Sequence, residues 1–449
     1  MYQVPQHISQ DKIFIVKKSE IEGRLGPDFY KPSIASLEKK IRLLSIKRLR
    51  SYAQSFAGGA TPSKREFEKY YSDTQTGIPF LRVQNLQTNG ELSLNECIYI
   101  NEETHNGLLK RSQVSEGDLL VKITGVGRMA IASVAPKDFV GNTNQHMVVI
   151  KTGNSAVSKY LAHYLNLDII EKIASRYSTG GTRPALDYHS LKNIPIIEGL
   201  DFSIIDNAIK AKKAKEVEAQ QLLDSIDGYL LKELGITIPS VDDGLKNRIF
   251  FSSFNKIRDN RIDPIYSLYL DKNASSAKYD NTSLRSVAHI EKGNTLSSSG
   301  IEEGNIPVIA GGQTSPYNHN KSNYKGNIIT VSASGAYAGY VWYHDYPIYA
   351  TDCCVIFSKD ESIFITKYLF EVLKLQQNGI YRSQTGAAQP HVYASDLQML
   401  NIPVVSIKKQ KEIVDYIANI RTRAKALQAE GKAILKDAKR KVEQMIMGE

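Results

Sequence analysis

The chain has 449 residues, which is too long for one hydrophobic core, so we expect two or three domains. Its 42% hydrophobic and 23% charged residues are typical of a soluble globular protein, and no apolar run approaches the roughly 18 residues of a membrane span. The net charge of +10 favours a polyanionic partner, although lysine-rich helices alone can produce this value. Cys97, Cys353 and Cys354 cannot form a disulfide framework, and no Cys or His spacing indicates a metal site. Because the N-terminus has no secretory pattern, we expect a cytoplasmic protein.

The first part of the chain predicts a short helix followed by a mostly β domain. In residues 32–44, Ile34, Leu37, Ile41 and Leu44 share one helical face, and Pro32 suits the first turn. Strand-like runs are separated by Gly, Asn and Pro, as in a β-rich domain. They are IFIV from Ile13, IPFLRV from Ile78, ECIYI from Glu96, DLLVKI from Asp118, AIASVA from Ala130 and HMVVIK from His146.

Residues 203–234 form the stretch around which the chain is organised, with no Pro and a single Gly, Gly228. Where the stretch is apolar, its apolar residues fall three or four positions apart, so one face of a helix would be apolar and the other charged. Such a face needs a partner. The apolar residues are Ile205, Ile209, Leu223, Ile226, Leu230 and Leu234.

The final segment, residues 409–447, is the best candidate for that partner. A near-heptad repeat predicts a second long helix with Ile413, Ile417, Ile420, Ala424, Leu427, Ile434, Ala438 and Met445 on one face. We expect the two helices to pair through Ile205, Ile209, Leu223, Ile226, Leu230, Ile413, Ile417, Ile420, Leu427 and Ile434. The alternative is two ordinary amphipathic helices, each packed on its own domain.

Each long helix follows an Asn-Ile-Pro sequence, and this coincidence belongs to a longer internal repeat whose pieces keep their order and a nearly constant offset. The pieces are Ile78-Pro79 with Ile306-Pro307, Gly117-Asp118 with Gly326-Asn327, Val149-Ile150 with Val355-Ile356, Lys159-Tyr160-Leu161 with Lys367-Tyr368-Leu369, Thr179-Gly180 with Thr385-Gly386, and Pro184 with Pro390. Between the first two pieces the first copy is longer, so it carries an extra segment. Similar scaffolds with different surfaces suggest two related functions on different targets.

The sequence therefore predicts an α+β protein with two similar β-rich domains separated by a pair of long antiparallel, coiled-coil-like helices. We place an N-terminal segment and the first domain at residues 1–200, the central helix at 201–238, the second domain at 239–404 and the C-terminal helix at 405–449.

These motifs resemble the target recognition domains of type I restriction-modification specificity subunits. In the first copy the resemblance is carried by GIPFLRVQNL from Gly77, EGDLLVKITG from Glu116, NQHMVVIK from Asn144 and STGGTRPALDYHSLKNIPI from Ser178. In the second it is carried by NIPVIAGG from Asn305, TDCCVIF from Thr351 and QTGAAQPHVYASDLQMLNIPV from Gln384. It covers nearly the whole chain from about Leu43, whereas the opening segment departs from the pattern.

The resemblance implies a DNA-reading subunit without a catalytic site. Each recognition domain would read one half of a split, asymmetric target, and the helices would set the gap. Two methyltransferase subunits would dock along the helices, bind S-adenosylmethionine and methylate adenine. Restriction subunits could join them, with ATP and Mg²⁺ bound by these partners rather than by this chain.

In the first domain, candidate DNA-binding residues follow strands and flank glycines, where rigid turns can present donors and acceptors to base edges and cations to phosphates. The alternative is a polar strand end that faces water. The candidates are Arg82, Gln84, Asn85, Lys122, Thr124, Arg128, Asn144, Thr182 and Arg183.

In the second domain we place Gln313, Tyr317, Asn318 and Lys321 at the position equivalent to residues 82–85. Ser332, Ser334, Tyr337 and Tyr340 surround the loop at Gly335, and Gln389 and His391 flank Pro390. The tyrosines and Trp342 could equally be core or rim aromatics. The basic residues of the final helix fit a solvated face better than a phosphate track. They are Lys425, Lys432, Lys436, Lys439, Arg440 and Lys441.

Catalytic motifs do not change this prediction. The sequence GVGRMA from Gly125 matches GxGxxA, the outline of a dinucleotide or S-adenosylmethionine loop, but a strand-like run follows where that motif needs a helix. The chain has no adjacent prolines for an adenine-methylation motif, no GxxxxGK[ST] and no HExxH. We predict no catalytic residue, metal or cofactor in this chain. The rival readings are a self-contained DNA methyltransferase or nuclease with unrecognised motifs, and a coiled-coil adaptor without a DNA role.

Overall fold

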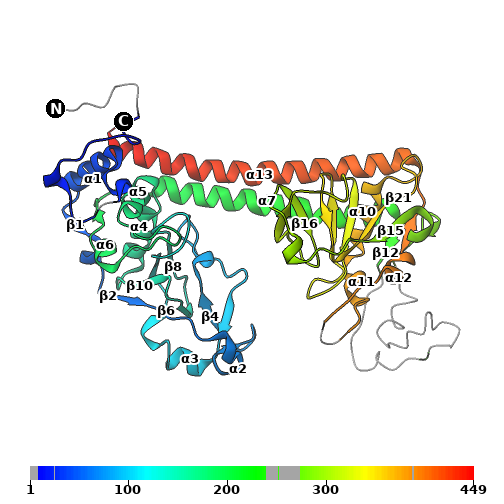
Figure 1. The fold of residues 1–449 in the computed structure, drawn as a ribbon, viewed down its shortest axis with the longest axis horizontal. Helices are drawn as coiled ribbons and strands as arrows, with labels where there is room; N and C mark the ends of the chain where they lie inside the picture. Colours follow the sequence, from blue (N-terminus) through cyan, green and yellow to red (C-terminus); the bar gives the residue numbers. More distant parts are fainter. Residues whose placement is uncertain (1–8, 25, 239–250, 252–273, 387–388, 449) are drawn as a thin grey trace. The chain divides into compact units, whose positions relative to one another are not determined.

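The computed structural model describes residues 9–24, 26–238, 251, 274–386 and 389–448. The chain divides into two compact units, coloured along the sequence in Figure 1. The first unit contains Met1–Lys215 and Ala429–Glu449, and the second contains Glu216–Gln428. The beginning of the second predicted domain, from residue 239 to 273, lies outside the described residues except for 251.

The first unit is built on two β-sheets. One is antiparallel with the order β2-β10-β7-β8, and the other is mixed with the order β3-β5-β4-β9-β6, in which β4 and β9 are parallel. The strands of these sheets and of the small β1-β11 pair are β1 Lys47–Arg48, β2 Ser55–Gly58, β3 Tyr71–Ser72, β4 Ile78–Leu81, β5 Ile98–Ile100, β6 Gln113–Ser115, β7 Leu119–Lys122, β8 Ala132–Val134, β9 Val140–Thr143, β10 Met147–Lys151 and β11 Pro195–Ile196. The run at residues 13–16 is not a strand, so that prediction was wrong.

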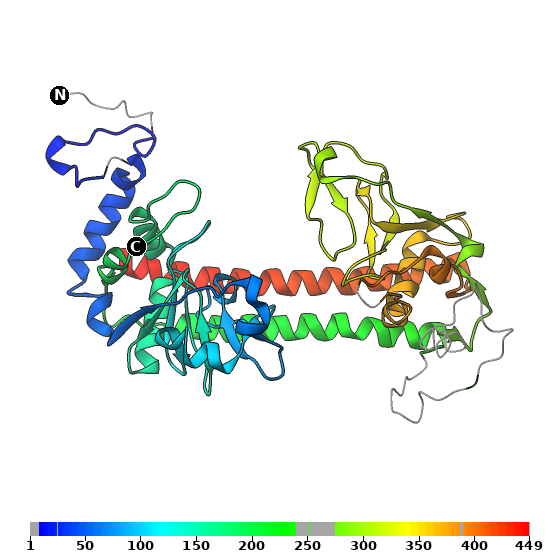
Figure 2. The same cartoon turned by 60° about the horizontal axis from the view of Figure 1, so that its bottom comes forward.

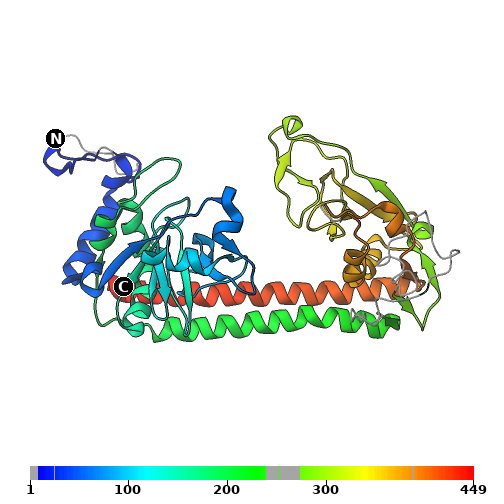
Figure 3. The same cartoon turned by 90° about the horizontal axis from the view of Figure 1, so that it is seen from below.

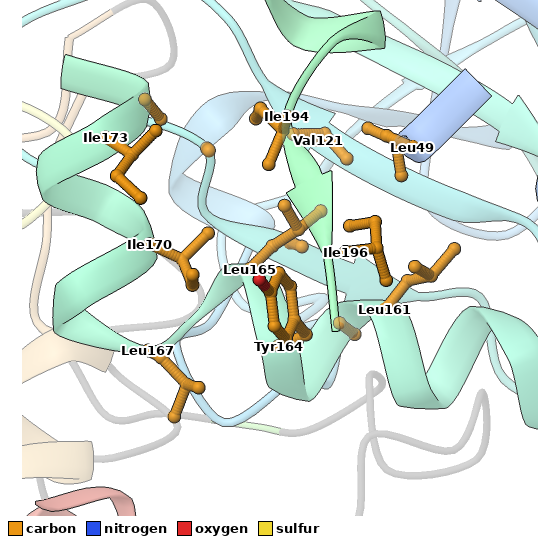
Figure 4. Close-up of a cluster of buried hydrophobic side chains, with 14 of the residues drawn as sticks. Leu49, Val121, Leu161, Tyr164, Leu165, Leu167, Ile170, Ile173, Ile194 and Ile196 are labelled. Carbon is orange, nitrogen blue, oxygen red and sulfur yellow. The ribbon is translucent and has the colours of Figure 1, made fainter. Parts of the chain in front are cut away.

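Helix α4 packs on the antiparallel sheet of the first unit through β7 and β8. The helices of this unit are α1 Pro32–Leu44, α2 Phe67–Tyr70, α3 Glu102–Asn106, α4 Ser155–Leu165, α5 Asp168–Arg176 and α6 Tyr188–Lys192. The side chain of Asn154 caps α4 by accepting from two backbone N–H groups. Tyr164 and Leu165 of α4 and Ile170 and Ile173 of α5 then pack into one buried core with neighbours on the sheet (Figure 4).

The N-terminal helix α1 packs against α5 (Figure 2). Glu38 of α1 is buried, and its carboxylate accepts from Arg42, from Arg176 of α5 and from the hydroxyl of Tyr177. Because a buried carboxylate is stable only when it is paired, this network fixes the N-terminal segment on the first unit.

The second unit repeats this plan. Its antiparallel sheet has the order β15-β21-β18-β19, and its three-stranded sheet, β17-β16-β20, again pairs two strands in parallel. The strands are β12 Ile236–Thr237, β13 Ser275–Ser276, β14 Asn281–Ser283, β15 Ala288–Lys292, β16 Ile306–Ile309, β17 Tyr317–His319, β18 Ile328–Ser332, β19 Val341–His344, β20 Tyr349–Ala350, β21 Cys353–Ser358 and β22 Asn401–Pro403. Its helices include α9 Leu284–Val287, α10 Thr366–Leu375, α11 Gln377–Arg382 and α12 Ala394–Gln398.

Matching details confirm the internal repeat. In both units the edge strand of the antiparallel sheet, β2 or β15, is followed by a glycine that passes very close to a threonine carbonyl. A Cβ on Gly59 would lie 1.7 Å from the carbonyl oxygen of Thr143, and one on Gly293 would lie 2.2 Å from that of Thr351. The extra segment of the first copy contains α3 and β6, which have no counterpart among the described residues of the second unit.

The two long helices form as predicted, α7 from Ser203–Leu234 and α13 from Ile407–Met447, and each continues from one unit into the other. In the first unit, Lys215 Nζ lies 3.0 Å from Glu430 Oε2, and a Cβ on Gly431 would lie 3.3 Å from Lys212 Cα. The helices therefore run side by side and antiparallel there (Figure 1, Figure 3).

The same pairing is found within the second unit. Arg423 pairs with Glu218 at 3.4 Å and Lys409 with Glu233 at 2.6 Å, while the rings of Tyr229 and Tyr416 lie 4.1 Å apart. The partner numbers in α13 fall as those in α7 rise, so the helices are antiparallel here as well. The predicted fold class, two β-rich domains with paired long helices, is confirmed.

The buried stripe of α13 keeps the heptad only in its first part. Ile413, Ile417 and Ile420 lie in the core of the second unit with Ile226 and Leu230 of α7, and Leu427 packs beside Ala219 with half-buried Leu223. In the first unit the stripe shifts to Leu435, Ala438, Val442 and Ile446 beside Ile205 and Ile209. Ile434 is half-buried at its flank, and Met445 is 68% exposed, so its predicted place on the apolar face was wrong. The shift arises because two four-residue steps follow each other, from Leu427 to Gly431 and from Gly431 to Leu435, where a heptad alternates steps of three and four.

Neither of these helices, nor any other among the described residues, has the apolar length that a membrane span requires.

Candidate nucleic-acid interface

In the first unit, loops from different parts of the sequence meet at one end of the sheets. The N–H of Asn144 donates to Leu81 O at 3.2 Å, which joins the turn before β10 to the end of β4. The N–H of Ile123 donates to His146 O at 2.9 Å, and Gly125 N donates to Pro184 O at 2.9 Å. Together with the turn after β2 at Gly59, these segments form what we call the loop cluster of the first unit.

The second unit has a loop cluster with the same connections. Thr351 N donates to Ile309 O at 2.9 Å, Ala333 N to Asp352 O at 3.2 Å, and Gly335 N to Pro390 O at 3.0 Å. The hairpins of the two clusters also match, because Thr179 pairs with Ala185 and Thr385 with His391. The repeated backbone thus brings equivalent loops together twice.

Several predicted residues of the first unit are exposed on its loop cluster. Gln84, Thr182 and Arg183 are exposed, and Thr124 is half-buried. Arg183 Nη2 donates to His146 Nε2 at 2.8 Å. Burial, and secondarily the charge of Arg183, lower the pKa of His146, so its ring is neutral at pH 7.

Other predicted residues of the first unit are held inside it. Asn85 is fully buried; its side chain accepts from Arg82 N and donates to Ser93 O, each at 2.8 Å. Arg82 is half-buried and donates to Glu96 O at 2.8 Å. Lys122 is buried and donates to Val126 O at 2.8 Å, and burial lowers its pKa. These three side chains are therefore engaged in shaping the loops.

Two further predicted residues are also engaged internally. Asn144 is buried, and its side-chain oxygen accepts from His146 N at 3.1 Å. Arg128 forms an ion pair with Asp168 and donates to Asn166 O at 2.7 Å. Arg128 therefore lies where the glycine loop meets the helices, not at the tip of the loop cluster.

In the second unit most of the predicted residues are exposed. Ser332 is buried and donates to Gly312 O, whereas Ser334 is half-buried and hydrogen-bonded to Asp352. Tyr340 lies under Lys374, whose Nζ is 4.2 Å from the ring centroid. His391 is half-buried and stacks on Tyr393. The exposed residues are Gln313, Tyr317, Asn318, Lys321, Tyr337 and Gln389.

The predicted equivalence of Tyr317, Asn318 and Lys321 with residues 82–85 was wrong. Tyr317 and Asn318 lie in β17, which pairs antiparallel with β16 as β5 pairs with β4, so β17 is the counterpart of β5. The counterpart of residues 82–85 is the turn directly after β16. The error arose because the segments between matched motifs differ in length, and sequence offsets do not show strand pairing.

Sequence reasoning missed some side chains of the loop clusters. In the first unit these are His146 and Gln145, the latter hydrogen-bonded to Thr61. In the second they are Asp352 and Tyr381, whose hydroxyl is hydrogen-bonded to Gln313. Gln145 and His146 stand inside the motif NQHMVVIK, where the turn is longer than in the second copy. This difference in length was the signal in the sequence that could have identified them.

The basic residues of α13 also need a correction. Lys439, predicted on a solvated face, reaches into the first unit, where its Nζ donates to Thr88 O at 2.7 Å and to Asn166 O at 3.1 Å. Burial lowers its pKa to about 8. Lys439 thus joins the C-terminal helix to the loop after β4.

The loop clusters expose amide, hydroxyl, guanidinium and ammonium groups, which suit base edges and phosphates. No group of His, Cys, Asp and Glu side chains within the described part of the chain could hold a metal ion. The glycine loop at Gly125 joins the antiparallel strands β7 and β8.

A model of the type I restriction modification DNA specificity domain matches the chain twice, at residues 45–197 and 277–436. The chain is thus built from two DNA specificity domains. Because the matches cover more than half of it, the chain belongs to the family of type I restriction-modification specificity subunits. It is a DNA-recognition subunit, and the catalytic functions of such systems are not its own.

Solved structures similar to this chain include two specificity subunits. That from M. genitalium is 13% identical with a TM-score of 0.42, covering 88% of this chain and 95% of its own. The HsdS subunit of Thermoanaerobacter tengcongensis is 14% identical with a TM-score of 0.36, covering 89% and 94%. A structure described as showing complex assembly and conformational transition of the type I R-M system is 16% identical with a TM-score of 0.40, covering 89% and 95%. A comparison with curated protein sequences finds no match.

Proposed function

We propose that each unit of this specificity subunit reads one half of a bipartite, asymmetric DNA target. The observation that carries this proposal is the repeated loop cluster with different side chains. The residue before the hairpin proline is Arg183 in the first unit and Gln389 in the second, and both side chains are exposed. Equivalent positions that present different hydrogen-bonding groups favour two different half-sites.

Within this proposal the predicted residues take two roles. Exposed side chains contact DNA: Gln84, Thr182 and Arg183 in the first unit, and Gln313, Tyr317, Asn318, Lys321, Tyr337 and Gln389 in the second. The internally bonded residues hold the loops in shape. These are Arg82, Asn85, Lys122, Arg128, Asn144 and Ser332.

Family membership supports a set of partners that supply the chemistry. In this proposal two methyltransferase subunits bind S-adenosylmethionine and methylate adenine at the DNA sites that the two loop clusters bind. The complex acts in the cytoplasm. Restriction subunits that use ATP and Mg²⁺ join the same complex when cleavage is required. The chain itself contributes the choice of sequence.

Mapping of methylated adenines in a host genome, with and without this gene, tests the proposal. We expect a motif of two short sequences separated by a fixed gap, present with the gene and lost on its deletion. A methylation pattern that does not change on deletion would contradict a specificity role in that host.

The competing function is a self-contained DNA methyltransferase or nuclease. Purified chain incubated with target DNA, S-adenosylmethionine and Mg²⁺ separates the two. Methyl transfer or cleavage without any added subunit would reject the recognition role, whereas we expect activity only after the partner subunits are added.

A further inference from the structure

A side-chain hydrogen bond on the exposed side of the first loop cluster joins Arg183 to His146. Arg183 is exposed on the hairpin, and its Nη2 donates to His146 Nε2 at 2.8 Å. Since Nε2 accepts, the proton of the neutral ring is on Nδ1. The bond uses one hydrogen of Nη2 and leaves the second, beside those of Nη1, for another acceptor.

The backbone on both sides of this contact is fixed. The hairpin is closed by the Thr179–Ala185 pair and held to the glycine loop by the bond from Gly125 N to Pro184 O. His146 is held through its own backbone, with its N–H on the side chain of Asn144 and its carbonyl accepting from Ile123 N. The guanidinium is therefore presented from two rigid turns, which lowers the entropy cost of using it in binding.

The second unit lacks this contact. Its turn between Ala350 and Cys353 contains Thr351 and Asp352, where the first unit has Asn144, Gln145 and His146 between Thr143 and Met147. Asp352 is hydrogen-bonded to Ser334, and the hairpin position of Arg183 is taken by Gln389. The carbonyl of Asp352 accepts from Ala333 N as that of His146 accepts from Ile123 N, so Asp352 occupies the place of His146. The second unit thus has no histidine where the first unit supports its arginine.

We infer that Arg183 reads a guanine in the half-site of the first unit and that His146 is the positioning residue that aims its guanidinium. Two parallel N–H groups of an arginine match the O6 and N7 acceptors of guanine in the major groove, the commonest specific contact of this kind. A neutral histidine beside it orients the arginine without adding a competing charge. This inference rests on the proposed function, because it names a base within the target that the first unit reads.

The test uses the complete complex in a host that lacks the chromosomal gene, complemented with the wild-type gene or with variants, and reads the methylated motif. For Arg183→Ala we expect discrimination at one guanine of one half-site to fall by roughly 5- to 150-fold, while the other half-site is unchanged. Arg183→Lys should recover little, because an ammonium cannot reproduce the paired donors.

Substitution of His146 separates positioning from folding. His146→Ala should weaken discrimination at the same guanine, and His146→Gln should restore part of it, because a glutamine oxygen can accept from Arg183. Arg50→Ala is the matched control, since Arg50 is also exposed and has a bond to the side chain of Asn193 at 2.9 Å. It should leave the motif unchanged.

The outcomes distinguish this inference from the proposed function. If the wild-type gene produces no bipartite motif, the proposed function fails. If the motif appears but Arg183→Ala leaves it unchanged, or relaxes a position that is not guanine, the assignment of Arg183 fails while the proposed function stands. If His146→Ala and Arg50→Ala both leave the motif unchanged, His146 has no positioning role.

Discussion

The two units share a scaffold but secure their recognition domains to the C-terminal helix by different chemistry. In the first unit, Lys439 of α13 donates to the backbone carbonyls of Thr88 and Asn166. In the second, Arg421 of α13 forms a two-pronged ion pair with Glu371, which is only 1% exposed. One attachment is therefore a cation bonded to backbone carbonyls, and the other is an ion pair between two side chains.

This difference teaches that the repeat conserves backbone geometry and leaves side-chain chemistry free to change. The close approach of Gly59 to a threonine carbonyl matches that of Gly293. The hydrogen bond from Gly125 N to Pro184 O likewise matches the one from Gly335 N to Pro390 O. The exposed tips and the buried attachments do not match. This freedom supports the proposal that the two units read different half-sites.

The largest expected effects test whether Gly59 and Gly293, which each approach a threonine carbonyl closely, play equivalent roles in the two units. Gly59→Ala should destabilise the first unit by about 3 kcal/mol or more, because its Cβ would meet the Thr143 carbonyl at 1.7 Å and the backbone must move. Gly293→Ala, with a distance of 2.2 Å, should cost the second unit about 2 to 3 kcal/mol. Amide hydrogen exchange resolved by unit measures both. A loss of protection in only one unit would break the equivalence.

Arg421→Ala should destabilise the second unit by about 3 kcal/mol, because it leaves the carboxylate of Glu371 buried without its partner. The double variant Arg421→Met with Glu371→Leu should be more stable than the single variant, since both charges are removed together. Urea unfolding followed by hydrogen exchange measures the two effects. Equal losses in the single and double variants would show that the pair is not compensated in this way.

Lys439 should make the stability of the first unit depend on alkaline pH. Its pKa of about 8 in the folded chain lies below the usual value of a lysine, so the folded state binds fewer protons than the unfolded state above pH 8. The penalty is present at and below pH 8 and is relieved as pH rises toward 10. Relative to Lys439→Met, the wild type should gain about 2 kcal/mol between pH 8 and pH 10.

The measurement is urea unfolding of both proteins across that range, so that other titrating groups cancel in the difference. Lys432→Met, at an exposed position of the same helix, is the matched control and should show no such gain. If the difference in free energy of unfolding between wild type and Lys439→Met stays constant with pH, Lys439 is not a buried cation.

The smallest expected effect contrasts one glycine of the helix pair in each unit. Gly228→Ala in the second unit should stabilise by about 1 kcal/mol, because nothing lies within 4 Å of the new Cβ and alanine favours a helix. Gly431→Ala in the first unit should gain nothing, because its Cβ would press on Lys212 at 3.3 Å. Thermal unfolding of the two variants compares them. An equal gain from both would mean that the helices do not approach closely at Gly431.

Local patterns in the sequence predicted the elements that depend on neighbours along the chain. The bounds of α1 and α7 follow from the position of Pro32 and from a long stretch with helical apolar spacing and no proline. The order of matched motifs predicted the duplicated scaffold. Strand pairing was beyond this reasoning, because β2 with β10 and β4 with β9 join segments distant in sequence.

The candidate site was predicted only as a set of residue types. Asn85 and Gln84 are neighbours with similar chemistry, yet one is buried with its amide bonded and the other is exposed. His146 was missed because its importance depends on the hairpin that carries Arg183, which is far away in the sequence. Burial and partners across loops are properties of the folded chain.

The sequence alone determined the helix-forming segments, the duplication and the chemical types at the loop tips, since these are written in residue order and spacing. Only the tertiary structure decided which of those side chains face outward and which are hydrogen-bonded inside the loops. It alone also showed that Lys439 inserts into the first unit. The physical reason is that a polar side chain bonds to whichever group packing brings within reach, and packing is set by contacts between distant parts of the chain.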